Sequence, residues 1–116
     1  MPTSEIIDRY TITLLKSERT EEDVSEELEA YKKELPDTDI AQNFIDRMYE
    51  INGKLWDTEG DIRKGVDMPL EEVGRLAIKV RELNQIRNGI KGEIVDKFAE
   101  GFKEIKVNYK KIDYGR

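Results

Sequence analysis

Charged and amide side chains interrupt the apolar periodicity of this chain, and they are the residues best placed to do chemistry. Side chains that recur at three- and four-residue steps stack on one face of a helix. A charge on such a seam needs a partner, because removing an ion from water is costly. The candidate polar-network or anion-binding residues are the seven that interrupt or flank the seams: Glu5, Asp8, Asn52, Glu59, Asn84, Arg87 and Lys91.

These seven residues allow more than one interpretation. If the N-terminal helix runs antiparallel to the helix that carries Arg87 and Lys91, Asp8 or Glu5 can reach one of those cations. The group would then be a polar network that fixes the register of a helical bundle. Alternatively, Arg87, Lys91 and Asn84 form a donor set for an anion or a polar ligand between helices. As a third interpretation, the residues are simply solvated at the edge of the seam.

The amino-acid composition removes several kinds of chemistry. The chain of 116 residues has no histidine and no cysteine. It therefore lacks the commonest general base, the thiol nucleophile, disulfides and the usual zinc ligands. Asp57 and Asp61 lie one helical turn apart and could share a magnesium ion, but a solvated helical face explains them more simply, and EF-hand spacing is absent. No catalytic residue, metal ligand or cofactor is predicted.

The charge pattern bears on partners and location. The net charge of −6 disfavours nucleic acid, because phosphate attraction supplies most non-specific affinity. An apolar stretch long enough for a membrane span or a signal peptide is absent, so a cytoplasmic protein without a membrane partner is expected. The acidic run 21–29 contrasts with the basic last fourteen residues, which are more simply explained as a solvated tail but could touch an anion or an acidic patch on a second copy.

The elements that position the candidate residues read as helices. Residues 68–98 form the longest periodic segment, with Asp67 as the expected N-cap. Another helix opens at residues 37–39 and joins the long one through a short turn, which predicts an antiparallel hairpin. Thr3 or Ser4 is expected to cap a first helix that ends near residue 19. Thr20 is expected to cap a short second helix on the outside of the bundle, which Pro36 ends.

The periodicity changes after residue 101. Ile105, Val107 and Tyr109 alternate with polar residues, as in a half-buried strand. The sequence thus predicts an all-α fold, a helical bundle built on a long antiparallel helical hairpin, over residues 1–101. Residues 102–116 are expected to form a short extended basic C-terminal arm. Because that strand has no partner in its own chain, a homodimer is expected.

Three separated stretches carry a family resemblance. Residues 4–12 read SEIIDRYTI, residues 52–63 read NGKLWDTEGDIR, and residues 83–94 read LNQIRNGIKGEI. In the same order they resemble the motifs G-E-L-I-D-K-x-T-I-L, N-x-x-L-W-x-x-E-D-x-I-R and L-N-x-x-R-x-x-I-K-x-x-I of a small bacterial and phage family of helical proteins. That family has no assigned biochemical function, so the resemblance implies a fold and no activity. Gly60 replaces an acidic residue of the pattern, which argues against a metal site there.

A second comparison supplies the enzyme hypothesis. Glu93 and Asp96 have the Glu-x-x-Asp spacing of the all-α nucleotide pyrophosphatases, whereas the acidic run 21–26 has the wrong spacing for their Glu-Glu-x-x-Glu element. The leading hypothesis is therefore a non-catalytic structural or interaction protein, which predicts a closed seam. The alternative is a small hydrolase or ligand-binding protein acting on a phosphorylated or other anionic compound, which predicts an open cleft at the polar residues.

Overall fold

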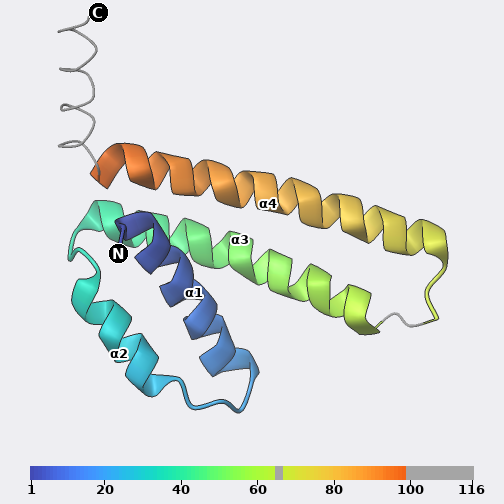
Figure 1. The fold of residues 1–116 in the computed structure, drawn as a ribbon, viewed down its shortest axis with the longest axis horizontal. Helices are drawn as coiled ribbons and strands as arrows, with labels where there is room; N and C mark the ends of the chain where they lie inside the picture. Colours follow the sequence, from blue (N-terminus) through green and yellow to red (C-terminus); the bar gives the residue numbers. More distant parts are fainter. Residues whose placement is uncertain (65–66, 99–116) are drawn as a thin grey trace, which may run out of the picture.

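The described part of the chain, residues 1–64 and 67–98 of the computed structural model, folds into four α-helices (Figure 1). They are α1 (Thr3–Arg19), α2 (Ser25–Glu34), α3 (Asp39–Lys64) and α4 (Leu70–Phe98). The predicted all-α bundle is confirmed. The expected strand at residues 105–109 and the arm at 102–116 lie outside the described residues.

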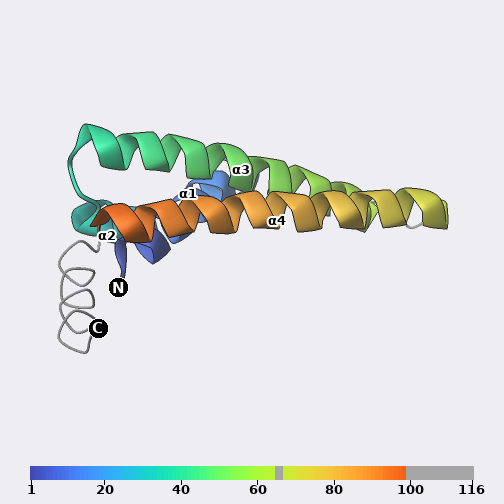
Figure 2. The same ribbon diagram turned by 90° about the horizontal axis from the view of Figure 1, so that it is seen from above.

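Helices α3 and α4 run side by side in opposite directions, as both views of the ribbon show (Figures 1 and 2). Their apolar residues recur at three- and four-residue steps, which gives each helix one continuous buried stripe. The ring of Phe98 meets Phe44 edge-to-face, with 6.1 Å between centroids. The buried core joins the two stripes with one residue of α1: Ile7, Phe44, Ile45, Met48, Ile51, Leu55, Leu83, Ile90 and Ile94.

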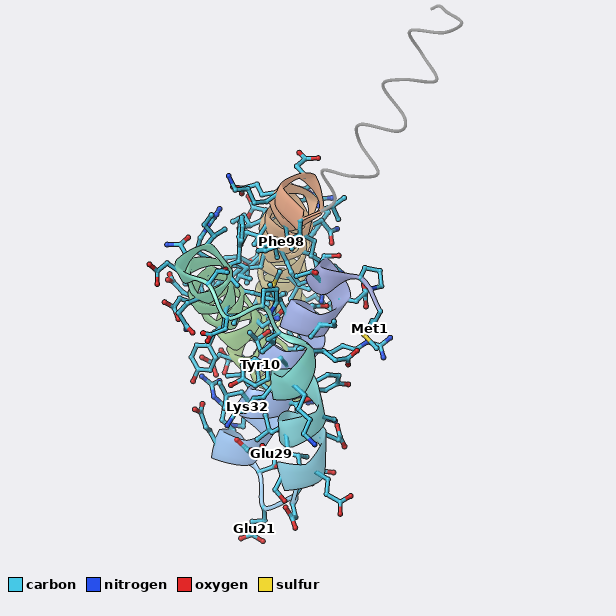
Figure 3. The ribbon with its side chains drawn as sticks, turned by 90° about the vertical axis from the view of Figure 1, so that its left-hand side faces the viewer. Met1, Tyr10, Glu21, Glu29, Lys32 and Phe98 are labelled. Carbon is cyan, nitrogen blue, oxygen red and sulfur yellow. The ribbon has the colours of Figure 1, made fainter. Side chains whose placement is uncertain are left out.

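Helix α1 lies against both helices of the hairpin, and α2 lies against α1. Ile7 and Leu15 of α1 are completely buried. By contrast, α2 has no buried residue, which agrees with its predicted place on the outside of the bundle. Figure 3 looks nearly along α3 and α4, and α1 and α2 extend side by side away from that pair. None of the described helices has an apolar stretch long enough to cross a bilayer.

Three predicted helix caps are wrong in detail. The Thr20 hydroxyl donates to the Lys16 carbonyl at 2.7 Å and so closes α1 instead of opening α2. Helix α2 starts after Val24 with no side-chain cap, although the Asp23 carboxylate just before it accepts from the Ser25 amide at 3.1 Å. Helix α4 begins after Pro69, whose carbonyl accepts the amides of residues 72 and 73, so Asp67 lies too early to be the N-cap. Helix α1 starts after Pro2 with no side-chain cap.

The start of α3 follows the prediction. The Thr38 hydroxyl accepts a hydrogen bond from the Ala41 amide at 3.1 Å, the geometry of an N-cap. Helix α3 then continues through the candidate residues Asn52 and Glu59. The hairpin therefore places this pair opposite the candidate residues of α4.

The adjacent residues Ile94 and Val95 test the core of the hairpin. Ile94 is completely buried, whereas Val95 is 47% exposed. We expect Ile94→Ala to lower the free energy of unfolding by about 2–5 kcal/mol, because it leaves a cavity between α4 and its neighbours. Val95→Ala should change it by no more than about 0.5 kcal/mol. Urea unfolding followed by circular dichroism measures both, and equal losses would contradict this packing.

Candidate functional site

A buried polar network joins α1 to α3 at Asn52. The Asn52 side-chain nitrogen donates to Asp8 Oδ1 at 3.0 Å and to Thr11 Oγ1 at 2.9 Å. The Thr11 hydroxyl in turn donates to the Asp8 carbonyl at 2.8 Å. Asn52 is 4% exposed, Asp8 6% and Thr11 0%. A buried carboxylate is stable only when its lone pairs are satisfied, and Asn52 satisfies part of this need.

Lys91 of α4 brings a positive charge to the same carboxylate. Its Nζ hydrogen-bonds Glu5 Oε1 at 2.7 Å and lies 3.6 Å from Asp8 Oδ2. The hydrogen bond and charge of Lys91, with a smaller contribution from Arg9, lower the pKa of the Glu5 carboxyl. The first helix thus meets α4 through two acidic residues one turn apart. This is the pairing that an antiparallel arrangement of α1 and α4 predicts.

A pocket of about 330 Å³ continues from this network along the junction of α1, α3 and α4. Arg87 contributes a guanidinium whose Nε is buried without a hydrogen-bond acceptor in the described part of the chain. Asn84 lies one turn before it on α4, and both are partly buried. The lining comes from α1, α3 and α4: Ile12, Leu15, Asn52, Leu55, Trp56, Glu59, Asn84 and Arg87.

The structure therefore divides the seven predicted residues into two groups. Glu5, Asp8 and Lys91 belong to the polar network, whereas Glu59, Asn84 and Arg87 line the pocket. Asn52 takes part in both. The predicted donors Asn84, Arg87 and Lys91 do not converge on one ligand site, because Lys91 is paired with the carboxylates of α1.

Two residues of the site were not among the predicted ones. Thr11 completes the network, and Trp56 forms part of the pocket wall. The signal for Thr11 was its spacing of three residues from Asp8, which places both on one face of a helix. The signal for Trp56 was its place between the candidate positions Asn52 and Glu59, one turn from Asn52.

In each of the two acidic pairs, Asp57–Asp61 and Glu93–Asp96, one carboxylate is paired with an arginine. Arg19 hydrogen-bonds Asp57, and Arg47 forms a two-point pair with Glu93 at 3.1 and 2.7 Å. Glu21, in the acidic run, lies at the far end of the α1–α2 pair from Phe98, which closes α4 (Figure 3). Across residues 1–64 and 67–98, no group of three or more acidic side chains is placed to hold a metal ion.

Comparison of the chain with models of protein families, with curated proteins and with solved structures finds no match. The resemblance to the bacterial and phage family stays a prediction. The interpretation of the site therefore depends on its own geometry.

The polar network makes a stability prediction at Asn52. Asn52→Ala removes the donor for Asp8 Oδ1 and Thr11 Oγ1 and leaves both in a buried environment. We expect a loss of about 1–3 kcal/mol in the free energy of unfolding. Asn43→Ala, at an exposed position of the same helix, is the matched control and should have little effect. If Asn52→Ala lowers the free energy of unfolding no more than Asn43→Ala does, the network does not stabilise the fold.

The Glu5–Lys91 pair makes a prediction about pH. The pKa of Glu5 is lower in the folded chain than its usual 4.5, so the pair stabilises the fold above that pH. This contribution is lost as the pH falls from 4.5 through the lowered pKa. Glu5→Gln should therefore destabilise the chain at neutral pH and have a smaller effect in strong acid. Glu82→Gln, at an exposed position of α4, should show no such difference in urea unfolding at the two pH values.

Proposed function

We propose that this protein is a non-catalytic interaction protein that assembles with a second copy of itself through the open flank of the α3–α4 hairpin. Two observations on the candidate residues support a structural role for the network. Asp8, Asn52 and Thr11 satisfy one another, and Lys91 is engaged by Glu5 and Asp8. A general acid or base would need to be free to exchange a proton with a substrate, and these groups are committed to holding α1.

The observation that carries the proposal is a groove of about 370 Å³ between α3 and α4. Leu83, Ile90 and Ile51 form its apolar floor, and Ile86 stands beside it with 53% of its surface exposed. A Cβ atom built on Gly89 would meet no heavy atom within 4 Å, so the groove is open at this position. None of the groove's lining residues belongs to α1 or α2.

A second copy of α4 fits this groove because α4 has a protruding side chain, Ile86, three residues before Gly89, which has no side chain. Ile86 and Gly89 lie on neighbouring positions of one helix face. If two copies meet around a two-fold axis between these positions, Ile86 of each copy enters the space beside Gly89 of the other. Such an isologous contact uses the same patch twice and closes at two copies.

The charges around the groove permit this approach. Arg47 and Lys54 contribute two positive charges, and Glu50 and Glu93 contribute two negative ones. The rim therefore has no net charge, although the chain carries −6. Helix α4, with 29 residues, is roughly 44 Å long, and a stable interface needs about 800 Å² from each partner. The flank of the hairpin is long enough to supply that area.

The hydrolase alternative has less support. Glu93 is paired with Arg47, and Glu21 of the acidic run lies far from Phe98, which closes the helix that carries Glu93 and Asp96 (Figure 3). Ligand binding, the other part of that alternative, involves a different feature, the pocket at Arg87.

Two exposed isoleucines of α4 test the proposed self-association. Ile86 lies at the groove and is 53% exposed, and Ile78 lies away from it and is 51% exposed. Light scattering on the full chain should give twice the chain mass of 13.6 kDa. Ile86→Glu should reduce it to one chain mass, because a charge would be buried in the apolar contact, whereas Ile78→Glu should remain a dimer.

Two outcomes would overturn this proposal. A monomeric wild-type chain at high concentration would exclude self-association. A dimer that survives Ile86→Glu would place the interface elsewhere, as the predicted arm at residues 102–116 would require.

A further inference from the structure

The pocket at the junction of α1, α3 and α4 contains a cation that forms no ion pair with a described carboxylate. Arg87 forms no hydrogen bond or ion pair within the described residues, and its Nε is buried. A guanidinium stays protonated at any pH a protein experiences, so it cannot relieve this cost by losing its proton. The neighbouring cation of α4, Lys91, is by contrast paired twice. Arg87 is thus available to an anion from outside the chain.

The pocket lining that comes from helices other than α4 is mixed, because α3 contributes the polar residues Asn52 and Glu59 beside apolar ones. Ile12 and Leu15 come from α1, and Leu55 and Trp56 come from α3. Asn84 is one turn from Arg87 on α4 and adds an amide that can donate a hydrogen bond. The volume of about 330 Å³ is near the lower limit for small-molecule sites. The pocket therefore places the Arg87 guanidinium and an amide within reach of several apolar side chains.

We infer that this pocket binds a small molecule with one carboxylate group on an apolar or aromatic body. Arg87 would pair with the carboxylate through its planar fork, and Asn84 would donate a further hydrogen bond. The body of the ligand would lie against Leu55 and Trp56. This inference does not depend on the proposed self-association, which uses the other flank of the hairpin.

The charge of the pocket selects a monocarboxylate over a phosphate. Arg87 and Glu59 are the charged residues of the lining, one of each sign. One carboxylate neutralises Arg87 completely, whereas a doubly charged phosphate would leave excess negative charge near Glu59. Glu59 is exposed at the edge of the pocket and could in addition accept a ligand ammonium group. The carboxylate can thus come from a simple organic acid or from an amino acid.

The fluorescence of Trp56 measures binding directly, because Trp56 is the single tryptophan of the chain. Four probes are titrated into the full chain: phenylacetate, 2-phenylethanol, phenylalanine and inorganic phosphate. Phenylacetate or phenylalanine should change the fluorescence in a saturable way. The uncharged 2-phenylethanol should bind at least about tenfold more weakly than the carboxylates. This is the loss of affinity expected when a charge-assisted hydrogen bond is missing. Phosphate should leave the fluorescence unchanged.

The preference between the two carboxylates identifies the source of the ligand. Tighter binding of phenylalanine, weakened by Glu59→Gln, would indicate an amino acid. Tighter binding of phenylacetate, strengthened by Glu59→Gln, would indicate an organic acid without an amine. Both results support the carboxylate site and depend on the sign of the charge at Glu59.

Arg87→Ala should weaken binding of the preferred carboxylate about tenfold or more, since the charge-assisted pair is lost. The unliganded variant should unfold near the wild-type temperature, because no described carboxylate loses its partner. Arg87→Lys keeps the charge without the fork and should bind with intermediate affinity. Arg81→Ala, at an exposed position of α4, and Ile86→Glu at the groove should both bind as the wild type does.

The inference is overturned if neither carboxylate changes the fluorescence of Trp56. It is also overturned if Arg87→Ala binds as tightly as the wild type, or if 2-phenylethanol or phosphate binds as well as the carboxylates. If Arg87→Ala fails to fold, the same titration with Arg87→Lys decides the question. If Arg87→Lys prefers the carboxylate over 2-phenylethanol by the same factor as the wild type, the guanidinium is not the partner of the carboxylate.

Discussion

The buried carboxylate of Asp8 sets where α1 lies on the α3–α4 hairpin. It accepts a hydrogen bond from Asn52 of α3 and lies near the ammonium of Lys91 on α4. A displacement of α1 by one turn would leave this charge buried without either partner, which is far more costly than the loss of an apolar contact. The apolar stripes alone would tolerate several positions, because neighbouring turns present similar side chains. Asp8 therefore selects one register.

The same constraint explains the pocket beside Arg87. Once Asp8 is placed against Lys91, the antiparallel direction of α1 carries Ile12 and Leu15 to the level of Arg87. Helix α1 has no acidic side chain at that level, so Arg87 forms no ion pair with a carboxylate of the described residues. A structural network and a candidate ligand site thus arise from one placement of α1.

Helix α1 covers only part of the hairpin. It packs at the junction with Asn52 and leaves the flank with Ile86 and Gly89 open. The open flank and the Arg87 pocket lie on different faces of α4, since Ile86 and Arg87 are successive residues about 100° apart around the helix. Self-association and ligand binding can therefore be removed by separate substitutions.

The sequence by itself determined the helices, because apolar residues at three- and four-residue steps have few other ways to be buried together. It also predicted that charges on an apolar seam, such as Asp8 and Lys91, need partners, but it left open which cation of α4 meets the carboxylates of α1. It misplaced the cap at Thr20, because several residues near a helix end can accept the same amides. Only the tertiary structure decided that Lys91 is neutralised and Arg87 is not. That outcome depends on the angle and register of α1 across two other helices, which distances along the chain do not specify.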